Sequence, residues 1–318
     1  MTARDSELAR RLRQDSVPVH QVSWRMGLDP RAALAAWQGA RRADLLHAHD
    51  GHAVAIAAAV SPLTGKPFVA TRRMARPLQA PQPWQGAAKV IAISEAVRAS
   101  LLESRIEPAR IEIIPPAIDV TATSETDPRA WVRLSEIPAQ SAIAAAVSAL
   151  TPEKGMDVLI EAAARLHDRC PLLHWVIAGA GPEQAALSAR AGALKSGPYV
   201  HFLGHLGDPL PVIAGATVLV VPSREEGFGS VILDALALGT PVIGTSVGGI
   251  PDALARGGGV LVPANDPAAL AQAVERLVSD PVYRNRLSAE GRKAAQSFDL
   301  GPMVNRVAAL YRSVKGVD

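Results

Sequence analysis

The sequence contains few of the residues that mark secreted, disulfide-rich or nucleic-acid-binding proteins. It has one cysteine, Cys170, among 318 residues, so no disulfide can form within the chain, which favours a reducing compartment. Aromatic residues make up 4% of the chain, too few for a surface that stacks on nucleic-acid bases. The net charge is only +3, from 33 basic and 30 acidic residues, so a nucleic-acid partner is not indicated.

The chain also lacks a targeting or membrane-spanning pattern. Its first residues, MTARDSELARRLRQD, contain no apolar stretch of the kind found in a secretory signal. The longest apolar segment without a charge runs from Ala235 to Pro251, and its glycines and prolines indicate a strand and loop instead of a membrane span. We therefore expect a cytoplasmic protein, and peripheral contact with the inner face of the membrane stays open.

What the sequence does contain is an alternation of short apolar runs and amphipathic stretches. Hydrophobic residues make up 48% of the chain, enough for packed cores, and its length suggests two domains. We interpret as strands the ranges 17–22, 44–48, 68–71, 89–93, 111–114, 142–148, 174–178, 199–203, 217–221, 241–244 and 260–262. The helical patterns between them include 156–167, 182–193, 267–278 and 300–314.

This alternation predicts an α/β protein with two Rossmann-like, doubly wound parallel sheets. We expect a first domain over residues 1–119, a polar linker over 120–140 and a second domain over 141–297. The helix expected over 298–318 either packs on the second domain or crosses back to the first. Ligands of such sheets bind beyond the carboxyl ends of the strands, so we expect functional residues directly after strands and in the cleft between the sheets.

The segment from Val220 to Leu254, VVPSREEGFGSVILDALALGTPVIGTSVGGIPDAL, carries the strongest functional signal. Its glycines let the backbone approach a ligand, and the free N–H groups of a helix starting near Ser230 favour a phosphate. Glu226 precedes that helix and Asp234 lies about two turns inside it. A carboxylate repels phosphate, so sugar hydroxyls are its natural partners. The alternative is a capped helix with a solvated glutamate.

Weaker signals follow three other strands. Lys154 precedes Gly155 in a loop where its charge would meet a phosphate, although a solvated surface lysine is the plainer interpretation. The glycines of VIAGAGP resemble the start of a dinucleotide fingerprint without its third glycine, which is weak evidence for NAD. His47 and His49 alternate along a strand end. His49 is a candidate for contact with the acceptor or for proton transfer, or it is a structural histidine. No further metal ligand clusters with these residues, so a metal site is not predicted.

Together these segments resemble the retaining glycosyltransferases of the GT-B class, family 4, also called glycosyl transferases group 1. In the second half the resemblance rests on the Lys154 loop, GAGP at 179–182, HFLGHL at 201–206, EGFG followed by GTPVIGTSVGGIPD, and the segment 257–278. In the first half it rests on LLHAHDGH at 45–52, KPFVATRR at 66–73 and KVIAISEAVRASLLE at 89–103. It covers nearly the whole chain.

The resemblance implies transfer of a sugar from a nucleotide-diphospho-sugar, such as a UDP- or GDP-sugar, with retention of configuration. It implies no cofactor and no metal, and the chain has no Asp-x-Asp pair. Glu226 would hold the sugar hydroxyls, Asp234 the ribose, and Lys154 the departing diphosphate. The acceptor is a glycan, a lipid-linked molecule or a small molecule. The further donor-binding residues we expect are Gly227, Phe228, Gly229, Ser230, Val231, Gly204, Leu206, Gly181 and Arg72.

Three positions depart from the family pattern. Asp234 replaces a glutamate and has a shorter reach. Ala149 replaces an arginine five residues before Lys154, a loss that would cost about 1.5–3 kcal/mol of charge-assisted bonding unless another residue replaces it. Arg73 replaces a histidine that faces the donor sugar, so we include Arg73 with Glu226, Lys154 and His49 among the catalytic candidates. Arg72 and Arg73 either restore the missing charge, hold an anionic acceptor, or form a solvated pair.

The beginning of the chain also departs from the family. The segment SELARRLRQDSVPVHQVSW resembles the second helix and following strand of the family's first domain, so that domain is expected to be one βαβ unit short. Such a loss would leave an unpaired sheet edge or a groove. The explanations are an upstream start, repair by a homo-oligomer, or a degenerate acceptor site. Two alternatives to a transferase follow: a non-catalytic nucleotide-sugar-binding subunit, and a GT-B sugar-nucleotide epimerase.

Overall fold

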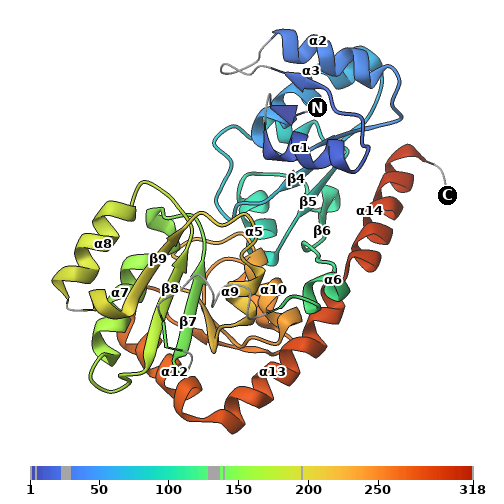
Figure 1. Cartoon of the computed structure of the whole chain (residues 1–318). Helices are drawn as coiled ribbons and strands as arrows, with labels where there is room; N and C mark the ends of the chain where they lie inside the picture. The colour runs from blue at the N-terminus through green and yellow to red at the C-terminus, as the bar shows by residue number, and fades with distance from the viewer. Residues whose placement is uncertain are drawn as a thin grey trace. The chain divides into compact units, whose positions relative to one another are not determined.

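The computed structural model describes residues 2–3, 6–22, 30–127, 137–138, 140–194 and 196–316. The chain divides into two units, each an α/β arrangement around a parallel sheet (Figure 1). Unit 1 comprises residues 1–93, 97–114 and 305–318, and unit 2 comprises residues 94–96 and 115–304. The predicted fold class, two parallel-sheet Rossmann-like units, is confirmed.

The sheet of unit 2 has six described strands in the order β12-β11-β10-β7-β8-β9, and every neighbouring pair is parallel. The order reverses between β7 and β10: β8 and β9 follow β7 toward one edge of the sheet, whereas β11 and β12 follow β10 toward the other edge. The strands are β7 (Ala142–Val147), β8 (Leu173–Ala178), β9 (Val200–Gly204), β10 (Val218–Val221), β11 (Val242–Thr245) and β12 (Gly259–Val262). The loops that follow β7 and β10 therefore lie side by side at the carboxyl edge of the sheet.

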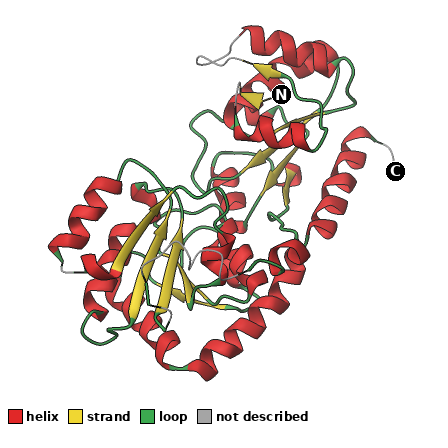
Figure 2. Ribbon diagram, in the orientation of Figure 1, coloured by secondary structure: helices red, strands yellow, loops and turns green. Residues whose placement is uncertain are grey.

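Unit 2 is an α/β layer structure because its central strands are apolar throughout. β10 (VLVV) is buried at every position, as expected for a strand that is covered on both faces, and helices lie on both sides of the sheet (Figure 2). Trp175 of β8 packs in one core cluster with side chains of α7 and α12. The helices of unit 2 are α6 (Val120–Ser124), α7 (Met156–Leu166), α8 (Gln184–Ala193), α9 (Leu210–Ala214), α10 (Ser230–Leu238), α11 (Ile250–Leu254), α12 (Pro267–Ser279) and α13 (Pro281–Ala295).

Unit 1 contains a four-stranded parallel sheet in the order β3-β4-β5-β6 and a separate parallel pair, β1-β2. The strands are β1 (Thr2–Ala3), β2 (Gln21–Val22), β3 (Leu46–Ala48), β4 (Phe68–Arg72), β5 (Lys89–Ala92) and β6 (Ile111–Ile113). The helices are α1 (Glu7–Gln14), α2 (Pro30–Ala40), α3 (Gly51–Thr64), α4 (Gln82–Gln85) and α5 (Glu95–Glu103). The last helix, α14 (Leu300–Lys315), contributes its residues from Asn305 onward to this unit.

Strand β3 is an edge of the four-stranded sheet. Among the described residues it pairs only with β4, and a cavity of about 900 Å³ borders it. The cavity is lined by residues of β3, α2 and α3, among them Leu46, Trp37 and Ile56. The structure thus contains both a sheet edge and a hollow at β3.

The main difference from the sequence-based expectation lies in the linker. Residues 120–140 are expected to be loop-like, but they begin with the short helix α6. Its start is capped by Asp119, whose Oδ1 accepts the backbone N–H of Ala122 at 2.9 Å. Residues 128–136 and 139 of the expected linker lie outside the described residues. In the part of the chain that the structure describes, no helix combines the length and the apolar character that a membrane span requires.

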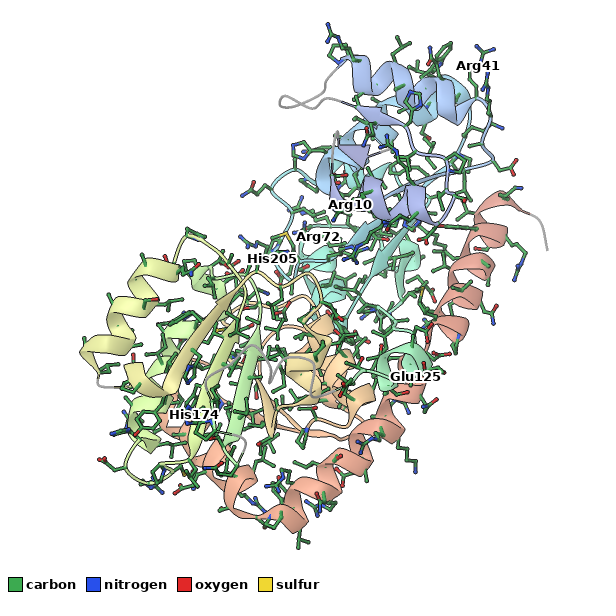
Figure 3. The ribbon with its side chains drawn as sticks, in the orientation of Figure 1. Arg10, Arg41, Arg72, Glu125, His174 and His205 are labelled. Atoms are coloured by element: carbon green, nitrogen blue, oxygen red, sulfur yellow. The ribbon has the colours of Figure 1, made fainter. Side chains whose placement is uncertain are left out.

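Two histidines face each other at the amino ends of β8 and β9. Nδ1 of His174 (labelled in Figure 3) lies 2.9 Å from Nε2 of His201, so one ring donates its N–H and the other accepts it. Burial lowers the pKa of both rings, and the charge of His174 lowers the pKa of His201 further. Both rings are therefore harder to protonate in the folded chain than a solvated histidine.

This pair should make unit 2 less stable in acid. Since the folded rings have lowered pKa values, the unfolded chain takes up more protons as the pH falls through about 6.5, and the free energy of unfolding decreases. We expect His201→Gln to flatten this decrease between pH 7.5 and 5.5 in urea unfolding, whereas His205→Gln, at an exposed histidine, leaves it unchanged. An identical pH dependence in all three proteins would contradict the role of the pair.

Candidate functional site

Lys154 and Glu226 meet where the loops after β7 and β10 lie side by side. The loop after β7 forms a single 3₁₀ turn, Pro152–Lys154, and the loop after β10 leads into α10. Nζ of Lys154 donates to Oε2 of Glu226 at 2.8 Å, and the two side chains are only 22% and 16% exposed. The strand order thus brings together two residues that the sequence analysis identified separately.

The carboxylate of Glu226 is held at both oxygens. Besides Lys154, the hydroxyl of Ser223 lies 3.4 Å from Oε2, and the backbone N–H of Gly227 donates to Oε1 at 3.2 Å. These donors keep the carboxylate in one orientation while its remaining lone pairs can accept further hydrogen bonds. Sequence reasoning did not single out Ser223, although it lies in the same motif.

A cavity of about 190 Å³ lies beside this ion pair. Five of the residues predicted to bind the donor or act in catalysis line it, together with the position that lacks the family's arginine: Lys154, Glu226, Gly229, Ser230, Val231 and Ala149. Helix α10 begins at Ser230 after Gly229, and no described side chain caps it. Its first N–H groups are therefore available to an anion at the cavity wall.

Glycines allow the loops to pack backbone against backbone. A Cβ on Gly155, which has a φ of +66°, would lie 2.1 Å from the carbonyl oxygen of Pro222. A Cβ on Gly248 (φ +54°) would lie 1.7 Å from the carbonyl oxygen of Glu226, and that oxygen accepts the N–H of Gly249 at 3.2 Å. The GTSVGGIPD motif thus supports the backbone of Glu226, a role that the sequence analysis missed.

The other donor-binding candidates of unit 2 are not among the described residues that line the cavity. Phe228 is 2% exposed and packs edge-on against Phe298, so its side chain is part of the core. The carbonyl oxygen of Gly204 accepts the N–H of Gly179 at 2.7 Å, which ties the end of β9 to the end of β8. Gly181 packs on Leu150, whose carbonyl oxygen would lie 2.3 Å from an added Cβ, and Leu206 is half-buried.

Asp234 occupies the inner turns of α10 and is half-buried. Burial raises the pKa of this carboxyl to about 6, and the negative charge of Asp208 contributes to the increase. Asp234 therefore changes its charge in the neutral range, unlike an ordinary aspartate.

The remaining candidates belong to unit 1. His47 is locked in place: its Nδ1 lies 2.6 Å from Oη of Tyr311 on α14, and its Nε2 lies 2.8 Å from Oγ1 of Thr71. Burial lowers the pKa of His47 to about 4, with the nearby charges of His49 and Arg73 contributing. His49 stacks on His47 with ring centroids 4.0 Å apart and is itself exposed. His47 is therefore the structural histidine of the pair, and His49 is the accessible one.

Arg72 and Arg73 differ in their surroundings. The guanidinium of Arg72, at the end of β4 (Figure 3), donates to the carbonyl oxygen of Arg76 at 2.9 Å and lies 5.7 Å from the ring of Trp84. Arg73 is exposed. Arg72 is thus half-buried and in contact with two neighbours, whereas Arg73 is open to solvent. Among the described residues, no group of three or more His, Cys, Asp or Glu is arranged to hold a metal ion.

Comparison with known proteins identifies the family. The family model described as glycosyl transferases group 1 matches residues 129–294, and the model of Glycosyltransferase Family 4 matches residues 2–122. The chain belongs to glycosyl transferases group 1. A D-inositol 3-phosphate glycosyltransferase of Frankia alni is 31% identical over an alignment of 331 positions, which covers 89% of this chain and 80% of the relative. The resemblance inferred from the motifs is thus confirmed.

Other relatives match over a shorter range. A D-inositol 3-phosphate glycosyltransferase of Corynebacterium glutamicum is 35% identical over 221 residues, 64% of this chain and 52% of the relative. In this match and those with the Corynebacterium efficiens and Salinispora tropica proteins, the chain spans about half the length of the curated relative.

Solved structures agree with the fold. The Anabaena protein Alr3699/HepE in complex with UDP-glucose superposes with a TM-score of 0.87 at 22% identity, covering 97% of this chain and 90% of that one. Sucrose-phosphate synthase from Thermosynechococcus elongatus gives a TM-score of 0.79 at 23% identity, covering 92% and 83%. These likenesses confirm the predicted GT-B fold.

The close backbone contact at Gly155 can be tested by substitution. We expect Gly155→Ala to lower the free energy of unfolding by about 1–3 kcal/mol, because the new Cβ meets the carbonyl oxygen of Pro222 at a positive φ. Gly192→Ala, in α8 with nothing within 4 Å, should leave stability unchanged or raise it by up to about 1 kcal/mol. Urea unfolding measures both, and equal stability of the two variants would rule out the contact.

Proposed function

We propose that this chain is a retaining glycosyltransferase that moves a sugar from a nucleotide-diphospho-sugar to an acceptor hydroxyl. The observation that carries the proposal is the Lys154–Glu226 pair, which shares one cavity with the uncapped start of α10. A cation and a helix start suit a diphosphate, whereas a carboxylate suits the hydroxyls of a sugar. A nucleotide sugar presents both groups next to each other.

In this reading the diphosphate binds at the start of α10 and takes hydrogen bonds from its N–H groups and from Nζ of Lys154. Glu226, kept in orientation by Ser223 and Gly227, then accepts hydrogen bonds from the hydroxyls of the donor sugar. Asp234, on the same helix, accepts hydrogen bonds from the ribose hydroxyls. The glycine-rich loop allows the donor to approach the backbone at these points.

Transfer breaks the bond between the anomeric carbon and the β-phosphate oxygen, and the electron pair of that bond stays on the phosphate. Lys154 and the N–H groups of α10 stabilise this developing charge. The acceptor hydroxyl attacks from the face that the phosphate leaves, and the phosphate oxygen takes its proton, so the configuration is retained. Lys154 is the one cation among the described residues that line the cavity, because Ala149 stands where the family has arginine.

The comparisons suggest which substrates to test. A structural neighbour was solved with UDP-glucose, so we propose a UDP-sugar as donor. Several relatives are named for D-inositol 3-phosphate, so we propose a phosphorylated polyol as acceptor. The exposed side chains of Arg73 and His49 in unit 1 suit the phosphate of such an acceptor. Desolvation is the main cause of the lowered pKa of His49, and the charge of Arg73 is the next. The two side chains therefore lie near one another.

Removal of the carboxylate at Glu226 tests the proposal directly. We expect Glu226→Ala to lower kcat for release of UDP from UDP-glucose by about 100-fold or more, because the reacting sugar loses its hydrogen-bond acceptor. UDP binding by isothermal titration should change by only a few fold. The control is Glu107→Ala, an exposed glutamate that pairs with Arg110 in unit 1 and should leave both quantities unchanged.

The other outcomes of this experiment are decisive as well. If the wild-type chain binds UDP-glucose but turns it over with no acceptor in a panel of phosphorylated polyols, glycans and lipid-linked sugars, it is a binding subunit. If it binds no nucleotide or nucleotide sugar at all, the donor site itself is refuted.

The raised pKa of Asp234 predicts a pH dependence of donor binding. Below about pH 6 this carboxyl is protonated and loses acceptor capacity, so UDP-glucose affinity should rise roughly 10-fold between pH 5 and pH 7. UDP-glucose is the appropriate probe because its diphosphate does not titrate in this range. Asp234→Asn should abolish the increase, and Asp208→Asn should move its midpoint to lower pH. An unchanged profile in Asp234→Asn would exclude Asp234 from ribose binding.

A further inference from the structure

Arg224 lies two residues before Glu226 and binds groups on three other segments. Its Nη1 and Nη2 donate to the two carboxylate oxygens of Asp157 at 2.8 and 2.7 Å. Nη1 also donates to the carbonyl oxygen of Pro152 at 2.7 Å, and Nε donates to Oδ1 of Asn265 at 2.6 Å. Every nitrogen of this guanidinium therefore has a partner.

The partners of Arg224 flank Lys154 on both sides. Pro152 begins the 3₁₀ turn that ends in Lys154, and Asp157 lies in the first turn of α7 directly after it. The backbone makes the same connection, since the N–H of Arg224 donates to the carbonyl oxygen of Glu153 at 2.7 Å. The segment that carries Lys154 is therefore fastened at both ends to the segment that carries Glu226.

The Arg224–Asp157 pair differs from an ordinary surface ion pair. Its side chains are 31% and 35% exposed, and its geometry is bidentate, which strengthens and orients such pairs. Burial by itself would raise the pKa of Asp157, but the hydrogen bonds and charge of Arg224, with two backbone N–H groups, bring it below the usual value. The pair therefore stays ionised throughout the neutral range.

We propose that Arg224 and Asp157 are positioning residues of the donor site, which hold Lys154 at the distance from Glu226 that a nucleotide sugar requires. This inference rests on the proposed function. Neither residue is among the described residues that line the cavity, so they would act only through the two loops. A lysine side chain has four rotatable bonds, so a fixed backbone is what limits where its amine can lie. Misplacing a catalytic group by about 1 Å can cost 100-fold in rate.

The chain contains a matched control on the same helix. Glu161, one turn after Asp157 in α7, forms an ion pair with Arg190 of α8. This pair joins two helices and involves neither of the two loops. The charge of Glu161 also acts on Arg224, and Arg190→Lys keeps the positive charge that faces it. Arg190→Lys therefore makes the same chemical change as Arg224→Lys and leaves the hydrogen bonds between the two loops in place.

The first experiment needs no donor. Acetylation of Lys154 by an amine-reactive ester is followed by peptide mass spectrometry in the wild-type chain, Arg224→Lys and Arg190→Lys. We expect Arg224→Lys to raise the rate at Lys154 several fold, because a lysine at 224 cannot bridge Pro152 and Asp157 and the Lys154 amine leaves its ion pair. Arg190→Lys should match the wild type. Equal rates in all three proteins would overturn the proposal.

The second experiment is a double-mutant cycle with UDP-glucose. We expect Arg224→Lys to lower kcat/KM about 10-fold when Lys154 is present and less than 2-fold in the Lys154→Ala background, since Arg224 acts through the amine of Lys154. Asp157→Asn should behave as Arg224→Lys does, and thermal unfolding shows whether each variant is folded. Equal fold-losses in both backgrounds would show a general structural role and overturn the proposal. If the wild type does not turn over UDP-glucose, the proposed function fails. The acetylation rates still test whether Arg224 and Asp157 position Lys154.

Discussion

The arrangement of the site depends on one topological constraint: the strand order of unit 2 reverses between β7 and β10. Two parallel strands that are neighbours in the sheet, but far apart in the chain, end at the same edge and send their loops to the same place. The ion pair of Lys154 and Glu226, the start of α10 and the cavity beside them all follow from that adjacency. The glycines in these loops lack a Cβ, so the backbone of one loop can pack directly against the backbone of the other.

Much of this fold could be predicted from the sequence because the central strands of unit 2 are apolar on both faces. The run AIAAAV of β7 has no polar residue and no helical period, and its bounds agree with the expected range to within one residue. Lys154 and Glu226 were found because each lies in a motif that follows a strand. The helix α6 was missed because five residues are too few to show a helical period, even though its capping aspartate is visible in the sequence.

The contacts that sequence reasoning could not find are those between polar residues far apart in the chain. Arg224 and Asp157 are 67 positions apart, and each looks like an ordinary surface charge in its own segment. His47 and Tyr311 are 264 positions apart, and nothing local distinguishes His47 from His49. Such pairings have no period and no spacing rule. Only the folded backbone shows that a guanidinium ties two loops together, or which of two histidines is structural.

The hydrogen bond between His47 and Tyr311 also bears on the order in which the chain completes its structure. Residues from Asn305 onward belong to unit 1, and Tyr311 contributes to its polar interior at β3. During synthesis from the amino end, the strands of unit 1 are made before those of unit 2, whereas their partner Tyr311 is made after them. Unit 1 can therefore form this contact only after unit 2 has been translated.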